Sequence, residues 1–92
     1  MESHPLGSQA ISPLGTASML IIVAPAGPLD PEHIAAFRTS GRQGVNYRRG
    51  VWHHPLIALN SGGDFLIVDR AGEGENLVLE KLVQPLEVFV PD

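Results

Sequence analysis

The apolar residues of this chain occur in short runs, and that segmentation limits what the chain can fold into. The runs are rich in β-branched residues, and glycine, proline, asparagine or aspartate bounds each of them; the sequence holds ten glycines and eight prolines. Runs of this kind are typical of β-strands. The expected strands are residues 19–23, 56–59, 65–68, 77–79 and 86–90.

The clearest local pattern is LIALNSGGDFLIVD, residues 56–69, in which two expected strands flank Ser61-Gly62-Gly63. Glycines supply the positive φ angles that tight hairpin turns require. This segment therefore predicts a β-hairpin.

One segment, LDPEHIAAF, favours a helix. Asp30 can cap it, Pro31 suits its first position, and Glu32 places negative charge near its N-terminus. Ile34 and Phe37 would then share a face, and we expect one short helical turn near residues 31–37. Short strands with a single helical turn predict a β-barrel or sandwich. A parallel α/β sheet is excluded because it needs crossover helices.

Charge and composition exclude several classes of protein. The 92 residues predict a single domain, and the net charge of −4 argues against binding nucleic acid. The apolar runs are too short to span a membrane, the N-terminus does not resemble a signal peptide, and the absence of cysteine is compatible with the cytoplasm. Four arginines fall within residues 38–49, which indicates either a small-anion pocket or a solvated basic loop.

The segment YRRGVWHHPLIAL, residues 47–59, concentrates polar chemistry just ahead of an apolar run. Because side chains alternate across a strand, His53 and His54 should face opposite ways, and Pro55 supports an extended His54. One histidine would then face the interior and the other the solvent or a neighbouring subunit. Alternation also places Tyr47 and Arg49 on one face, with Arg48 on the other.

Three blocks carry a family resemblance: HPLGSQAISP (4–13), GVNYRRGVWHHPLIAL (44–59) and DFLIVDR (64–70). In order and spacing they resemble the ureidoglycolate lyase family, also called ureidoglycolate hydrolases, and correspond to its C-terminal part. The resemblance implies a cupin-like β-barrel of jelly-roll type and a cytoplasmic homodimer. It also implies cleavage of ureidoglycolate to glyoxylate and urea in allantoin and purine breakdown, stimulated by a divalent metal such as nickel. We expect no tightly bound cofactor.

Two features depart from the family pattern. Family members are longer, so we expect residues 1–92 to form a single cupin-like domain that lacks the family's N-terminal portion. Arg48 stands where similar proteins often carry histidine. Arginine stays protonated at working pH, so an acid–base role at position 48 is in doubt.

The implied substrate is a carboxylate whose carbinol carbon bears urea. Arginine can hold the carboxylate with two donors, and histidine can take the hydroxyl proton. The candidate catalytic residues are His53, Tyr47 and Arg49. The candidate substrate-binding residues are Arg48, Gln9, Trp52 and Asp69, and the candidate metal ligands are His4 and His53.

Each candidate also has a structural explanation. His53 can be a hydrogen-bonded histidine at a strand end, His4 lies close to the terminus, and Trp52 and Tyr47 can be core residues. Asp69 and Arg70 can form an ion pair. The alternative function is a truncated, inactive module that binds small carboxylates or assembles dimers. The sequence holds no Ser–His–Asp order, phosphate loop or zinc helix motif.

Overall fold

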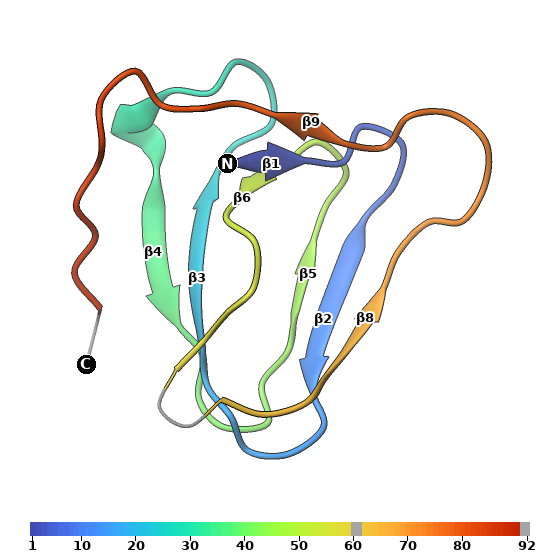
Figure 1. The fold of residues 1–92 in the computed structure, drawn as a ribbon, viewed down its shortest axis with the longest axis vertical. Coiled ribbons are helices and arrows are strands. Elements are labelled where there is room, and N and C mark those ends of the chain that lie inside the picture. Colours follow the sequence, from blue (N-terminus) through green and yellow to red (C-terminus); the bar gives the residue numbers. More distant parts are fainter. Residues whose placement is uncertain (60–61, 91–92) are drawn as a thin grey trace.

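A computed structural model describes residues 1–59 and 62–90, and their regular structure is almost entirely β (Figure 1). All strand pairings are antiparallel, and they form two sheets. The larger sheet has the order β4–β3–β6–β1–β9, and β7 pairs with β3. Its strands are β1 (Glu2–Ser3), β3 (Met19–Ala24), β4 (Ala35–Arg38), β6 (Trp52–His53), β7 (Ile57–Ala58) and β9 (Val78–Leu79).

The smaller sheet has the order β5–β2–β8. Its strands are β2 (Gln9–Pro13), β5 (Val45–Tyr47) and β8 (Phe65–Val68). Figure 1 shows β3 and β4 on one side of the molecule and this smaller sheet on the other, with β6, β1 and β9 crossing the top. The molecule is flat, measuring 34 × 32 × 15 Å.

The core lies where the two sheets meet. Its buried residues are Ile11 of β2, Met19 and Ile21 of β3, and Tyr47 of β5. Met19 and Ile21 face the same way because residues two apart share one face of a strand. Truncating a buried methionine such as Met19 to alanine costs about 2–5 kcal/mol. This small core holds Tyr47 in place, and Tyr47 in turn contacts a residue of the candidate site described below.

The expected mainly β architecture is confirmed, and no strand pairing within the described part of the chain is parallel. Four of the five expected strands are present: β8 has the expected bounds, and β3, β7 and β9 have slightly different ones. The described pairings form two separate sheets, so a closed cupin-like barrel stays a prediction.

The predicted hairpin over residues 56–69 is wrong. β7 pairs with β3 (Leu20↔Ile57), whereas β8 pairs with β2 (Ile11↔Ile67), so the two strands belong to different sheets. The expected turn residue Ser61 lies outside the described residues. Gly62 does adopt the predicted positive φ, at 75°, and lies in sequence between β7 of the larger sheet and β8 of the smaller one.

The predicted helical turn near residues 31–37 is only partly correct. A 3₁₀ turn covers Pro31–His33, capped as expected by Asp30, whose Oδ1 accepts a 2.9 Å hydrogen bond from the Glu32 N–H. From Ala35 the chain forms β4 and pairs with β3, so Phe37 lies on a strand. Backbone pairing to a long apolar strand satisfies more groups than another turn of an isolated helix would.

The strand expected over residues 86–90 is also wrong, since this described segment has no strand pairing. Leu86 and Val88 line a small hollow together with Ile22 and Ile34. The tail therefore attaches to the larger sheet through side chains.

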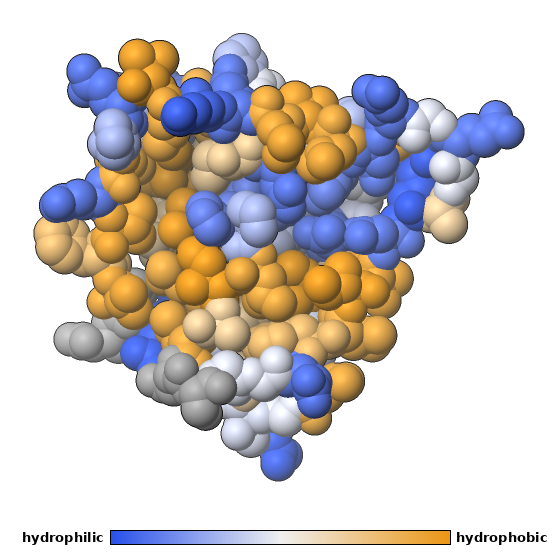
Figure 2. All heavy atoms as spheres, viewed as in Figure 1, coloured by the Kyte–Doolittle hydropathy of each residue, from blue (hydrophilic) through white to orange (hydrophobic). Residues whose placement is uncertain are grey.

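Apolar side chains cover much of the molecular surface seen in Figure 2. β8 is the last strand of its sheet, and its residues Leu66, Ile67 and Val68 are each about half exposed (54%, 47% and 56%). An unpaired strand edge of this kind favours pairing with another chain. Within residues 1–59 and 62–90, no helix has the length and apolarity that crossing a membrane requires.

Candidate functional site

His53 lies at the centre of the larger sheet. β6 is a short strand between β3 and β1, where His53 is opposite Val23 on one side and Glu2 on the other. Its side chain is 1% exposed, whereas His54 is exposed. The prediction that the two histidines face opposite ways is therefore confirmed.

Two contacts fix the His53 ring. Nδ1 lies 3.2 Å from the carbonyl oxygen of Val51, and this oxygen can only accept a hydrogen bond. The ring also stacks on Tyr47, with centroids 4.0 Å apart and planes 5° apart. Burial lowers the pKa of His53, although the Val51 hydrogen bond and the Glu2 charge act in the opposite direction. His53 is thus neutral at pH 7, with its proton on Nδ1 and a lone pair on Nε2.

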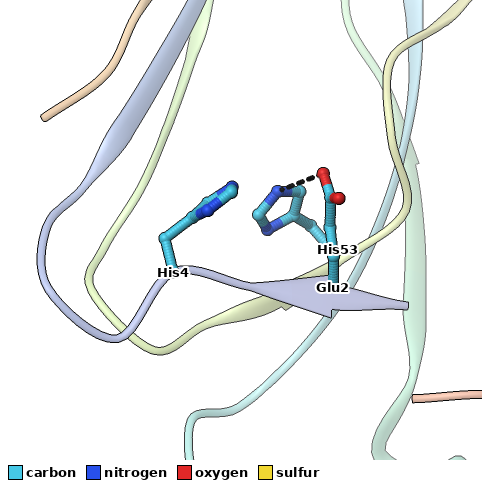
Figure 3. Close-up of side chains that lie close together, drawn as sticks. All are labelled: Glu2, His4 and His53. Atoms are coloured by element: carbon cyan, nitrogen blue, oxygen red, sulfur yellow. Dashed lines mark ion pairs between the residues drawn. The ribbon is translucent and has the colours of Figure 1, made fainter. Parts of the chain in front are cut away.

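Glu2 and His4 approach His53 from β1 and the residue after it (Figure 3). They lie two residues apart, a spacing that puts both side chains on one face of an extended segment. Oε1 of Glu2 is 3.3 Å from Nε2 of His53, and the rings of His4 and His53 are 5.0 Å apart. Nδ1 of His4 lies 2.7 Å from the main-chain oxygen of Asn76, so His4 also carries its proton on Nδ1.

The Nε2 atoms of His4 and His53 are both buried, and neither has a hydrogen-bond partner among residues 1–59 and 62–90. Buried polar atoms are normally hydrogen-bonded, so a pair without partners requires an explanation. One ligand atom from each of Glu2, His4 and His53 lies within 4.8 Å of the others. Two imidazoles whose Nδ1 atoms bind backbone carbonyls, together with a carboxylate, form a donor set suited to a divalent transition metal. We call these three residues the Glu2–His4–His53 cluster.

Tyr47 connects the cluster to an open cavity of about 540 Å³ between β3, β4 and β5. Tyr47 and Val51 line the cavity and also contact His53, whereas none of the three cluster residues is part of the cavity lining. Arg38 and Arg48 line the cavity as well. Burial, reinforced by the charge of Glu2, raises the pKa of Tyr47 to about 12. Its hydroxyl is therefore a neutral donor.

The other predicted site residues lie around this centre or away from it. Gln9 is the strand partner of Tyr47 and is half-buried. Trp52 is buried, and its Nε1 donates a 2.7 Å hydrogen bond to the Gly27 oxygen, which gives it a structural role. Arg49 is exposed in the turn closed by Val51 N–H and Arg48 C=O, and is not among the cavity-lining residues.

Asp69 lies apart from the cluster, in a separate surface hollow that it shares with Ser8 and Arg70. In the described part of the chain no ion pair joins Asp69 to Arg70; the two acid–base contacts there are Asp30–His33 and Glu2–His53. The expected Asp69–Arg70 pair is therefore wrong.

Sequence reasoning missed Glu2. The pattern Glu-x-His at residues 2–4 does place a carboxylate and an imidazole on one face of a strand. β1 has only two residues and no apolar run, so its extended conformation comes from pairing with β6 and β9.

Comparisons with known proteins agree on one family. A model of the family described as ureidoglycolate lyase matches residues 1–89. A protein named ureidoglycolate lyase from Burkholderia mallei (strain NCTC 10229) is 57% identical over 86 residues, 94% of this chain and 51% of its own length. The protein of the same name from Stutzerimonas stutzeri (strain A1501) is 54% identical over 77 residues, 83% of this chain and 45% of its own. The chain thus spans about half the length of the curated relatives it matches.

Proposed function

This chain belongs to the ureidoglycolate lyase family, and we propose that the Glu2–His4–His53 cluster is the reactive centre for cleaving ureidoglycolate to glyoxylate and urea. The observation that carries the proposal is the pair of buried, partnerless Nε2 atoms facing a carboxylate. A buried neutral histidine is an effective proton acceptor near neutral pH.

The reaction requires one proton transfer and one bond cleavage. Nε2 of His53 accepts the proton of the substrate's hydroxyl, and the O–H electron pair forms the carbonyl of glyoxylate. The C–N bond breaks, its electrons go to the urea nitrogen, and this nitrogen takes up the proton that Nε2 of His53 accepted. Atoms and charge balance without a covalent intermediate on the protein.

A divalent metal fits the same three residues. Glu2, His4 and His53 would hold it, with the Asn76 and Val51 carbonyls orienting the two rings. Nε2 of His53 would then be a ligand, so it acts as the base only in the metal-free chain. When bound, a metal such as nickel would supply Lewis acidity that lowers the pKa of a hydroxyl near it.

The cavity suits the carboxylate end of the substrate. Arg48 lines it beside Tyr47, and a guanidinium binds a carboxylate through two parallel hydrogen bonds. We assign the carboxylate to Arg48 in preference to Arg49, which is outside the cavity lining. Tyr47, between cavity and cluster, would donate its hydroxyl proton in a hydrogen bond to substrate. Gln9, its strand partner, would support the same wall.

We also propose a pathway, a cellular compartment and an oligomeric state for this chain. The product chemistry belongs to allantoin breakdown, and a chain without cysteine suits the cytoplasm. We propose a homodimer in which the exposed apolar edge of β8 pairs with its copy in a second chain.

One observation favours a second function, that of a module that binds small carboxylates without turning them over. The cavity lining includes two arginines but none of the three cluster residues, so an anion can be held without reaching Nε2 of His53. Such a module would bind glyoxylate and release none from ureidoglycolate.

A direct assay separates the two functions. Glyoxylate release from ureidoglycolate is measured with and without added nickel, for the unmodified chain, His53→Ala and the exposed-neighbour control His54→Ala. The proposal predicts release by the unmodified chain and by His54→Ala, and none by His53→Ala although this variant still folds. Glyoxylate binding by the unmodified chain without any release would favour the module.

A further inference from the structure

We infer that Asn76 is a positioning residue that fixes which ring nitrogen of His4 carries the proton; its consequence for metal binding rests on the function proposed above. Asn76 is 72 residues from His4 in sequence, yet its main-chain oxygen is 2.7 Å from Nδ1 of His4. A carbonyl oxygen has no proton to give, so the proton of this hydrogen bond belongs to Nδ1. The lone pair is then left on Nε2, the buried atom that faces the cluster.

The side chain of Asn76 makes a second contact with the same segment. Its Oδ1 accepts a 2.8 Å hydrogen bond from the main-chain N–H of Leu6. Asn76 therefore holds the N-terminal segment at two points, at His4 through its carbonyl and at Leu6 through its side chain. The adjacent β1–β9 pairing, in which Ser3 is opposite Val78, continues the same attachment.

Because of these contacts, the side chain of Asn76 holds the main-chain carbonyl of the same residue in position beside His4. Without Oδ1, Leu6 N–H loses its partner, and the loop before β9 is no longer tied to the residue two positions beyond His4. The Nδ1 hydrogen bond of His4 then weakens, and the ring can adopt the form with its proton on Nε2. In that form Nε2 can neither accept a proton nor bind a metal.

The test uses ¹⁵N chemical shifts of His4 in the metal-free 92-residue chain, which report the tautomer directly, together with nickel affinity by calorimetry. Asn76→Ala should move His4 from the Nδ1–H form towards a mixture and lower nickel affinity by about 10–100-fold, the usual effect of losing a partner that orients a ligand. Asn76→Asp keeps an acceptor oxygen at the same position and should restore the Nδ1–H form. Gln84→Ala, which removes an exposed amide from the tail, should change neither quantity.

A purely structural Asn76 would lower the melting temperature and leave the His4 tautomer and nickel affinity unchanged, and that result overturns the inference. Asn76→Ser, whose hydroxyl stops short of Leu6, replaces the alanine variant if the latter does not fold. If the unmodified chain binds no nickel but Asn76→Ala still shifts the tautomer, the positioning role stands and the metal part of the proposed function fails.

Discussion

Nε2 of His53 lies 3.3 Å from Oε1 of Glu2. The two atoms are close enough for a hydrogen bond, but their geometry is not that of one. Burial lowers the pKa of His53, and the His53 proton is committed to the Val51 oxygen. Two lone pairs therefore face each other in a buried setting. Such a contact is favourable when a proton or a metal ion occupies the space between the two atoms, and the proposed chemistry depends on this property.

Glu2→Gln tests the role of the carboxylate. The variant keeps the size of the side chain but removes its charge, so nickel affinity should fall by at least about tenfold. Calorimetry measures the change, with Glu80→Gln as a control that removes the same charge from an exposed position on the segment paired with β1. Equal losses in both variants would mean that net charge, and not the cluster, attracts the metal.

Tyr47 gives a signal of its own because it is the only tyrosine in the chain. Absorbance at 295 nm should report ionisation near pH 12 in the folded chain and near pH 10 in urea. Because the folded pKa is the higher one, this tyrosine's contribution to stability is complete below pH 10 and is lost as pH rises to about 12. Glu2→Gln should lower the folded midpoint, since the Glu2 charge raises this pKa. A midpoint near 10 in a folded chain would contradict the burial of Tyr47.

His53 should make the chain less stable in mild acid. Its pKa in the folded chain is below the ordinary 6.5, so as pH falls through this value the unfolded chain takes up a proton that the folded chain does not. The free energy of unfolding should therefore fall from pH 7 to pH 5, as measured by fluorescence of the single tryptophan in urea. His53→Gln should reduce this pH dependence, and His54→Gln should leave it in place. If His53→Gln left this pH dependence unchanged, other titratable groups would be responsible for it.

Ile67→Lys tests the proposed dimer. A charge on the exposed edge strand β8 opposes strand pairing between chains. Sedimentation should show a monomer, and stability of the monomer itself should change by no more than about 0.5 kcal/mol. Val83→Lys is the matched control, because Val83 is 99% exposed in the tail. A dimer that persists in Ile67→Lys would place the interface elsewhere.

Local sequence patterns predicted which residues form strands better than they predicted which strands pair with one another. The runs around Met19 and Phe65 are strands because β-branched, apolar residues suit a half-buried sheet. Their pairing depends on residues far apart in the sequence, so β7 joined β3 and not β8. The Asp30 cap was predictable for the same local reason, whereas β4 replaced the rest of the expected helix through its long-range pairing with β3.

In the candidate site, too, the features that depend on local sequence were predictable, and those that depend on long-range pairing were not. Alternation along one strand predicted that His53 and His54 face opposite ways, and the structure buries His53 and exposes His54. The approach of Glu2 and the hydrogen bond from His4 to Asn76 depend on the pairing of β1 with β6 and β9. A strand of two residues is too short for its sequence to predict that pairing. The assignment of arginines to the cavity was equally non-local, since Arg48 lines it beside Phe37 and Arg38 of β4, whereas Arg49 is not among the lining residues.

Anomalous diffraction at the nickel edge, from crystals of the chain grown with nickel, decides whether the Glu2–His4–His53 cluster binds a metal. We expect one strong peak about 2.1 Å from Nε2 of both His4 and His53 and in contact with a Glu2 oxygen. A nickel ion bound only elsewhere on the chain, with these two nitrogens and the Glu2 carboxylate unchanged, would contradict it.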